Sequence, residues 1–191
     1  MRSPFIVSLQ RGTSMIEVLV TIVILTFGLL GLVGLQTKLQ VSEMEAYQRA
    51  QALILLEDMA SRIATNRNFA ASYVTTAEAP LGVGVNCPSA TSTVRQVSDA
   101  GEWCNALQGV GETTGTGANT NRIGAMIGGG GCVEDLGGGQ YMVTVAWQGI
   151  GPLSAPPDEV ACGAGLYTGP GCDDELCRRT LTTIVRIATL I

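Results

Sequence analysis

Glu17 is the side chain whose surroundings in the sequence most clearly need a chemical explanation. It is the only ionisable residue from Met15 to Leu35, and Thr21 and Thr26 are the only other polar side chains there. On membrane-insertion scales a charged side chain costs about 2.5–3.5 kcal/mol at the centre of a bilayer and less near the interface. A chain that keeps such a cost is expected to use the charge. The alternative is a carboxylate near the lipid head groups without a partner.

The cysteines are the second group of residues with evident chemistry. None of them forms a C-x-x-C pair, which disfavours zinc-ribbon and thioredoxin-like sites. An even number, all beyond the apolar run, favours structural disulfides in an oxidising compartment over a metal cluster or a redox centre. We expect Cys87–Cys104 first, because these two are consecutive and enclose a low-complexity loop whose closure stabilises by about 3 kcal/mol. The six candidates are Cys87, Cys104, Cys132, Cys162, Cys172 and Cys177.

An acidic segment near the C-terminus holds oxygen ligands of the kind that calcium prefers. It has no EF-hand-like alternation, so a solvated acidic loop is the favoured interpretation, and we predict no metal site and no cofactor. Gly128–Gly131 precede no Gly-Lys-Ser/Thr and follow no predicted strand, which disfavours a phosphate-binding loop. The acidic residues concerned are Asp158, Glu159, Asp173, Asp174 and Glu175.

The composition excludes several classes of function. Histidine is absent, which removes His-based triads and the commonest metal ligand. No nucleophile–base pair stands out, so we predict that the chain is not an enzyme. Arg2 and Arg11 are two of the eleven basic residues, so beyond Gly12 nine basic side chains face 16 acidic ones. Nucleic acid is therefore not an expected partner, because phosphate binding needs a basic surface.

The run from Met15 to Leu35 is long enough to cross a membrane. At about 1.5 Å per residue its helix would span about 30 Å. It exceeds the roughly 7–15 apolar residues of a signal peptide, and no A-x-A cleavage signal follows it. Arg2 and Arg11 favour a cytoplasmic N-terminus by the positive-inside rule. We expect residues 1–12 in the cytoplasm, a retained single-pass anchor, and the remainder outside the cytoplasm, where disulfides can form.

The helical pattern continues beyond the membrane boundary. No proline occurs between Pro4 and Pro80, and apolar residues recur at spacings of three and four with charged residues between them. We predict one helix from Met15 to Ala64, apolar all round over residues 13–35 and with a single apolar face over 36–64. The recurring residues are Leu35, Leu39, Ala46, Ala50, Leu53, Leu56, Met59, Ala60 and Ile63.

Three glycines interrupt the apolar half of this helix, at Gly28, Gly31 and Gly34. Small residues at such spacing let a second helix approach closely, although each glycine lowers helix stability by about 1 kcal/mol. They are interpreted either as ordinary glycines of a membrane helix or as a packing or melting site.

The remaining residues, 65–191, are expected to form a small head. Residues 65–139 are rich in Gly, Ser, Thr and Asn and predict loops, with one short helix at 97–107. Residues 140–148 and 178–191 alternate as strands do, and can lie on the amphipathic half of the helix. Tyr141 and Trp147 share one strand face and are expected in the core. The fold class is therefore α+β: a long N-terminal helix packed against a small antiparallel sheet with disulfide-pinned loops.

The segment from Gly12 through Glu17 into the apolar run resembles the class III signal of type IV prepilins and pseudopilins. It joins a basic leader, a glycine, a glutamate at fixed spacing and a long apolar helix. The resemblance implies that a prepilin peptidase cuts between Gly12 and Thr13 and methylates the new N-terminus. Thr13 stands where the family usually has phenylalanine. Glu17 then becomes the fifth mature residue, whose carboxylate pairs with the N-terminal ammonium of a neighbouring subunit during assembly.

The run from Ile24 to Gln36 and the Tyr-x-Val-x-Val-x-Trp strand at 141–147 are similar to the minor pilin family called type IV pilus modification protein PilV. A member of that family is a structural subunit of the initiation or tip complex of a type IV pilus. It starts as a single-pass inner-membrane protein with a periplasmic head and is then assembled into a pilus at the cell surface. The implied partners are the prepilin peptidase, other minor pilins, the major pilin and a tip-located adhesin-like protein.

Two other functions stay open. One is a minor pseudopilin of a type II secretion system, which shares the N-terminal signal. The other is an anchored extracellular adhesion or binding module whose Gly-rich loops contact a surface. Loss of pili, loss of secreted enzymes or loss of attachment on deletion would separate the three.

Overall fold

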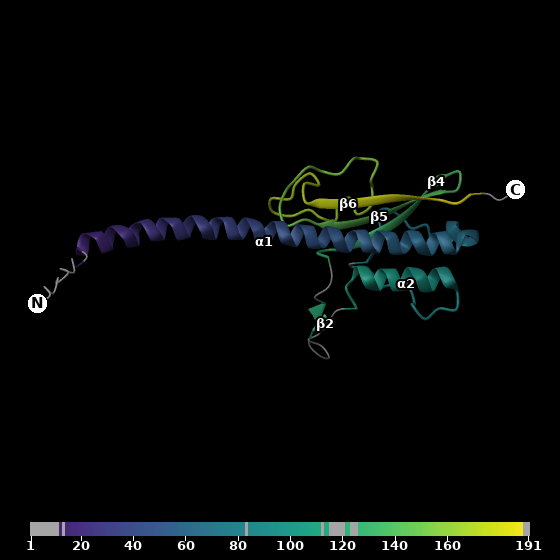
Figure 1. Cartoon of the computed structure of the whole chain (residues 1–191). Helices are drawn as coiled ribbons and strands as arrows, with labels where there is room; N and C mark the ends of the chain where they lie inside the picture. The colour runs from purple at the N-terminus through teal and green to yellow at the C-terminus, as the bar shows by residue number, and fades with distance from the viewer. Residues whose placement is uncertain are drawn as a thin grey trace, which may run out of the picture. The chain divides into compact units, whose positions relative to one another are not determined.

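The fold is α+β, as expected: one long N-terminal helix packs against a four-stranded antiparallel sheet (Figure 1). The computed structural model describes residues 12, 14–82, 84–111, 113–114, 121–122 and 126–188. Its elements in chain order are α1 (Met15–Thr65), η1 (Arg67–Tyr73), β1 (Leu81–Gly82), α2 (Arg95–Leu107), β2 (Thr113–Thr114), β3 (Asn121–Arg122), β4 (Gly130–Gly137), β5 (Gln140–Gln148) and β6 (Arg178–Arg186).

Helix α1 is continuous over 51 residues and ends one residue beyond the predicted limit at Ala64. Its residues belong to two units, Met1–Glu43 and Met44–Ile191, which are described separately. In the first unit every described side chain from Met15 to Glu43 is exposed. The second unit contains all the buried residues of the helix, so the buried core of the described residues lies in that unit.

The buried stripe of α1 differs in part from the predicted apolar face. Leu56, Met59 and Ile63 are buried, as the spacing predicted. Ala46, Ala50 and Leu53 were expected on the same face but are exposed. The stripe instead passes through Ala52 and Gln48, because the amide oxygen of Gln48 accepts a hydrogen bond from the backbone N–H of Ile127 at 3.3 Å. This bond offsets part of the desolvation of the side chain, whose amide nitrogen is buried without a partner in the described structure.

The sheet has the strand order β1-β4-β5-β6, and every neighbouring pair is antiparallel. Strand β5 has the predicted bounds. Strand β6 begins at Arg178 as predicted but ends at Arg186, five residues before the predicted end at Ile191, and residues 189–191 lie outside the described part. Along β6 the half-buried Leu181, Thr183 and Val185 alternate with exposed neighbours, so the predicted period of two is confirmed.

Strand β4 lies in the stretch that the sequence assigned to loops, and that assignment was wrong. A hairpin joins β4 to β5 through Gly138 and Gly139, whose φ angles are 62° and 74°. Two-residue hairpin turns of this kind need positive φ at both positions, which glycine adopts without steric cost. The run of glycines before the strong β5 pattern was therefore a hairpin signal.

The two faces of β5 are both covered at its centre. Tyr141 and Trp147, with the valines between them, lie in the main core with α1, which confirms their predicted role. On the other face Ala146 contacts a second buried cluster formed with Tyr167 and a cysteine pair. The connection between β5 and β6 supplies this cover, so the sheet is not a surface layer at this point.

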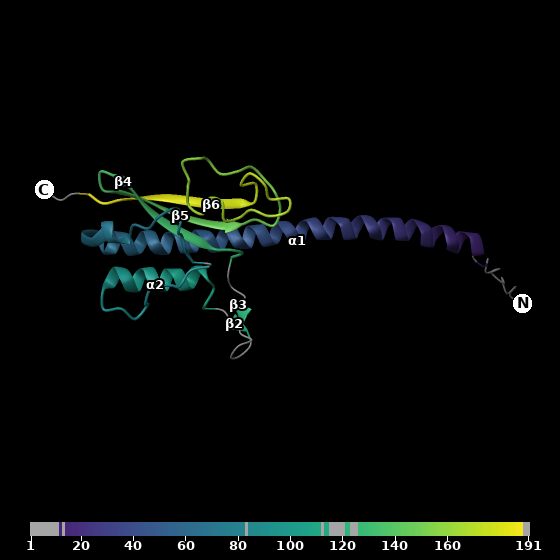
Figure 2. The ribbon, with the colours of Figure 1, turned by 180° about the vertical axis from the view of Figure 1, so that it is seen from behind.

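Helix α2 begins two residues before the predicted start and completes the main core. In both views α2 and the sheet lie on different sides of the C-terminal half of α1 (Figures 1 and 2). Trp103 of α2 is fully buried, and its indole N–H donates to the carbonyl of Leu55 at 2.8 Å. This hydrogen bond ties α2 to α1 within the head.

Candidate functional site

Glu17 lies in the first turn of α1. The carbonyl of Ser14 accepts the N–H groups of Glu17 and Val18 at 3.0 and 3.3 Å, which starts the helix just before the carboxylate. A negative charge in the first turn interacts favourably with the helix dipole. Gly12 is exposed, and Thr13, the predicted first residue of the processed chain, lies outside the described residues.

Glu17 differs from the other polar side chains of the apolar run in lacking a partner. The hydroxyl groups of Thr21 and Thr26 donate to the carbonyls of Val18 and Val23, each at 2.8 Å. These hydroxyls are satisfied inside the helix and need nothing from outside. The Glu17 carboxylate is exposed and forms no hydrogen bond or ion pair with any residue in the described ranges, so no described group neutralises it.

The apolar side chains around Glu17 are exposed along the whole helical segment. Phe27 is 72% exposed and Leu30 is 68% exposed, and no residue of the segment is buried. In the described part of the chain α1 is the one helix long and apolar enough to cross a membrane. Exposure of this extent is stable only in lipid or against another apolar surface.

The three glycines of the segment are not needed by the chain itself. A Cβ atom added at Gly28, Gly31 or Gly34 would meet no described atom within 4 Å. The space beside them is open, which suits the close approach of a second helix.

All six cysteines form disulfides within the head. The predicted pair Cys87–Cys104 is confirmed, with a Cα–Cα distance of 5.5 Å, and it fastens the segment before α2 onto α2. The other pairs, Cys132–Cys162 and Cys172–Cys177, have sequence separations of 30 and 5. On the loop-entropy estimate they stabilise by about 3.5 and 2 kcal/mol. The pairing agrees with an oxidising compartment for this part of the chain.

Glu175 is the member of the acidic C-terminal segment that pairs with an arginine in the described structure. Glu175 pairs with Arg178 and also accepts the N–H of Gly165 at 2.7 Å. Arg178 is 4% exposed and donates to the carbonyl oxygens of Val160 and Cys162 at 2.6 and 3.1 Å. No group of three or more Asp, Glu, Cys or His side chains in the described residues is placed to hold a metal ion.

A charged cluster between α1 and α2 was not predicted. Arg62 binds the carboxylates of Asp58, Asp99 and Glu102 at 2.9, 3.0 and 2.7 Å. Burial alone would lower the pKa of Arg62, but hydrogen bonds to the three carboxylates outweigh it and raise that pKa. Asp99 also accepts the hydroxyl of Tyr73 at 2.5 Å, and burial followed by this bond raises the pKa of Tyr73. The spacing of Asp58 and Arg62 was a sequence signal for this cluster.

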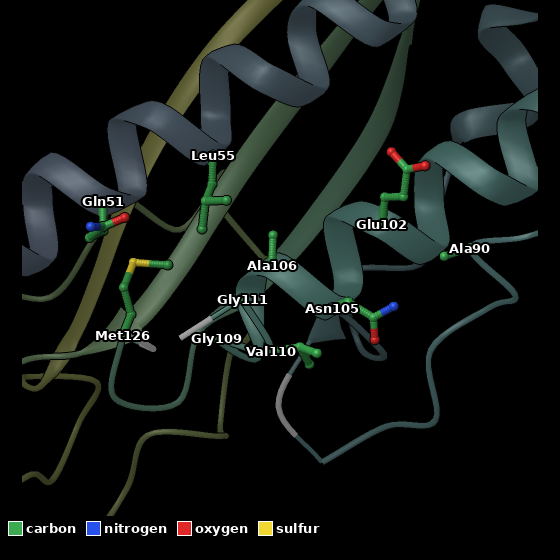
Figure 3. Close-up of a pocket in the computed structure, with 10 residues that line it drawn as sticks. All are labelled: Gln51, Leu55, Ala90, Glu102, Asn105, Ala106, Gly109, Val110, Gly111 and Met126. Atoms are coloured by element: carbon green, nitrogen blue, oxygen red, sulfur yellow. The ribbon is translucent and has the colours of Figure 1, made fainter. Parts of the chain in front are cut away.

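A groove of about 410 Å³ lies beside this cluster, between α1 and α2 (Figure 3). Leu55, Ala106 and Met126 contribute apolar surface, as Figure 3 shows. Glu102 is the one ionisable side chain among the described lining residues, and its carboxylate is bonded to Arg62. Among these described lining residues, therefore, no acid, base or nucleophile is left free of a partner for chemistry.

Comparison with known proteins gave no match: no family model, no curated protein and no solved structure is similar to this chain at a significant level. The candidate functional site is therefore identified from the geometry of the described residues alone. It is the Glu17 carboxylate, at the head of an exposed apolar helix that continues into the packed head.

Proposed function

We propose that this chain is a minor pilin, a structural subunit of a type IV pilus that acts in the initiation or tip complex. The single observation that carries the proposal is the placement of Glu17. Its carboxylate lies five residues after Gly12, in the first turn of the 51-residue α1, and it lacks a partner in the described residues. A subunit whose assembly pairs this carboxylate with a neighbour's N-terminal ammonium would need this arrangement.

The rest of the chain supports the same proposal. A long exposed apolar segment can sit in the inner membrane first and among the helices of other subunits later. The head packs on the other half of α1 and is held by three disulfides, as suits a periplasmic and then extracellular location. The proposed partners are the prepilin peptidase, other minor pilins, the major pilin and a tip-located adhesin-like protein.

Two other functions would use the same features. A minor pseudopilin of a type II secretion system would carry the same N-terminal signal and would assemble through the same carboxylate. An anchored adhesion module would use the membrane segment but would not need Glu17. The minor pilin is preferred because it also accounts for the resemblance of the Ile24–Gln36 run and of the β5 strand.

Deletion of the gene tests the proposal. We expect surface pili to fall sharply in number, to recover when the intact chain is supplied in trans, and secretion of exported enzymes to stay normal. Pilus number is counted by electron microscopy and by the major pilin in sheared fractions. Normal pili with lost enzyme secretion would instead indicate the pseudopilin, and normal pili with lost attachment would indicate the adhesion module.

A further inference from the structure

Strand β6 is an edge strand of the four-stranded sheet, so in the described structure it pairs with β5 on one side and with no strand on the other. The N–H of Ile187 donates to the carbonyl of Gly139, and the N–H of Gly149 donates to the carbonyl of Cys177, each at 2.8 Å. In an antiparallel ladder the paired residues alternate along the strand. The odd-numbered residues of β6 therefore bond to β5, and the even-numbered ones direct their N–H and C=O groups to the free edge.

The free edge is accessible over most of its length. Thr182, Ile184 and Arg186 are exposed, Ile184 by 48%, and Thr180 is partly covered. The backbone groups of these even-numbered residues form no hydrogen bond with the described part of the chain. Natural edge strands are usually protected by proline, a bulge, an inward-pointing charge or short length. Over its nine residues β6 has no proline and pairs with β5 without a bulge.

The charge of Arg186 indicates what kind of strand the free edge of β6 would bind. Arg186 is exposed and forms no ion pair in the described structure, whereas Arg178 and Arg179 at the other end of β6 are bonded to carboxylates and loop carbonyls. An unpaired guanidinium at the end of an open edge suits a carboxylate on an incoming strand, since the two form charge-assisted hydrogen bonds.

A second copy of this chain does not suit the edge. Two identical strands that pair by the same edge do so antiparallel, about a two-fold axis that reverses every direction along the strand. A second copy would therefore bring a β6 strand that holds three arginines, Arg178, Arg179 and Arg186, and no Asp or Glu. It offers no carboxylate to Arg186, and like charges on paired strands repel one another.

We propose that the free edge of β6 binds an extended segment of a second, non-identical protein. This segment adds a fifth strand beside β6 through main-chain hydrogen bonds and places an Asp or Glu side chain against Arg186. Strand addition of this kind takes affinity from the backbone and specificity from alternate side chains.

The test uses the full chain in its own membrane, with a photo-cross-linking amino acid at position 184. We expect a cross-link to a different polypeptide, mapped by mass spectrometry to an extended segment that holds an Asp or Glu. Thr182→Pro removes one N–H from the free edge and none from the ladder with β5. It should lower the cross-link yield by about tenfold, and Thr182→Ala, which keeps that N–H, should not.

A second pair of variants, at Arg186, distinguishes loss of binding from misfolding of the head. Arg186→Glu should lower the yield as strongly as Thr182→Pro, and Arg186→Gln should lower it less, while the melting temperature of each stays near that of the parent chain. A cross-link between two copies, a yield insensitive to both Thr182→Pro and Arg186→Glu, or no cross-link at all would overturn the proposal. Membrane insertion and N-terminal processing are measured in the same samples, so failure of the proposed function would be seen separately.

Discussion

Glu17→Ala is expected to reduce the amount of this protein in sheared filaments by at least about tenfold, the factor that corresponds to about 1.4 kcal/mol, while its amount in the membrane is unchanged. The carboxylate is the one polar side chain of the Met15–Leu35 run without a partner in the described structure. In lipid an ion pair loses most of its value when one partner is removed, because the other charge is left uncompensated. Immunoblots of sheared and membrane fractions measure both amounts.

Thr21→Ala is the matched control for this experiment. Thr21 lies one turn further along α1, and its hydroxyl is already bonded to Val18 at 2.8 Å, so its removal should leave incorporation unchanged. Glu17→Asp keeps the charge on a shorter side chain and should retain part of the incorporation. Equal amounts of parent and Glu17→Ala chains in filaments would show that the carboxylate has no role in assembly.

Gly131→Ala is expected to lower the free energy of unfolding of the head by about 3 kcal/mol, at the upper end of overpacking costs. A Cβ atom at this position of β4 would lie 2.1 Å from Cη2 of Trp103. That indole is fully buried and bonded to the carbonyl of Leu55, so it cannot move without losing packing or a hydrogen bond. Chemical denaturation followed by tryptophan fluorescence measures the change.

A double-mutant cycle tests the stated cause. In a Trp103→Phe background the ring no longer extends toward β4, so Gly131→Ala should cost at least about 1 kcal/mol less than in the parent chain. Gly151→Ala is the control, because a Cβ atom there would meet no described atom within 4 Å. Additive effects of Trp103→Phe and Gly131→Ala would contradict a direct clash between the two positions.

The long helix and the central strand could be predicted because their signals are local and strong. No proline interrupts the chain between Pro4 and Pro80, and apolar residues recur at helical spacing, so α1 was placed to within one residue. The β5 strand alternates valines and aromatic residues over its whole length. In each case the side-chain pattern and the packing of the head favour the same element.

Strand β4 and the part of the buried stripe of α1 at Gln48 and Ala52 could not be predicted, because long-range partners determine both. Gly130 and Gly131 have low strand propensity, and they lie in a strand because β5 pairs with both. Trp103 also needs the space that Gly131 leaves. Gln48 is buried because the backbone of Ile127 provides a donor for its side chain. Neither partner is evident from the residues next to it in the sequence.

For the candidate site, too, the sequence predicted one part and left another part open. The position of Glu17 at the start of an apolar helix followed from the sequence, and the structure adds that its carboxylate has no partner in the described chain. The proposed partner belongs to another molecule, so the role of Glu17 in assembly stays a prediction. Of the disulfides, only Cys87–Cys104 could be expected from spacing, since the ends of Cys132–Cys162 are brought together by the connection that covers β5.

The central claim is that the chain is processed as a prepilin, and the intact mass and N-terminal sequence of the protein from membranes or sheared filaments test it most directly. The account predicts a chain that begins at Thr13, with or without one added methyl group, in cells that have the prepilin peptidase. A chain that keeps residues 1–12 in those cells would contradict it. The protein would then be an anchored domain in which the glycine and the glutamate stand at this spacing by coincidence.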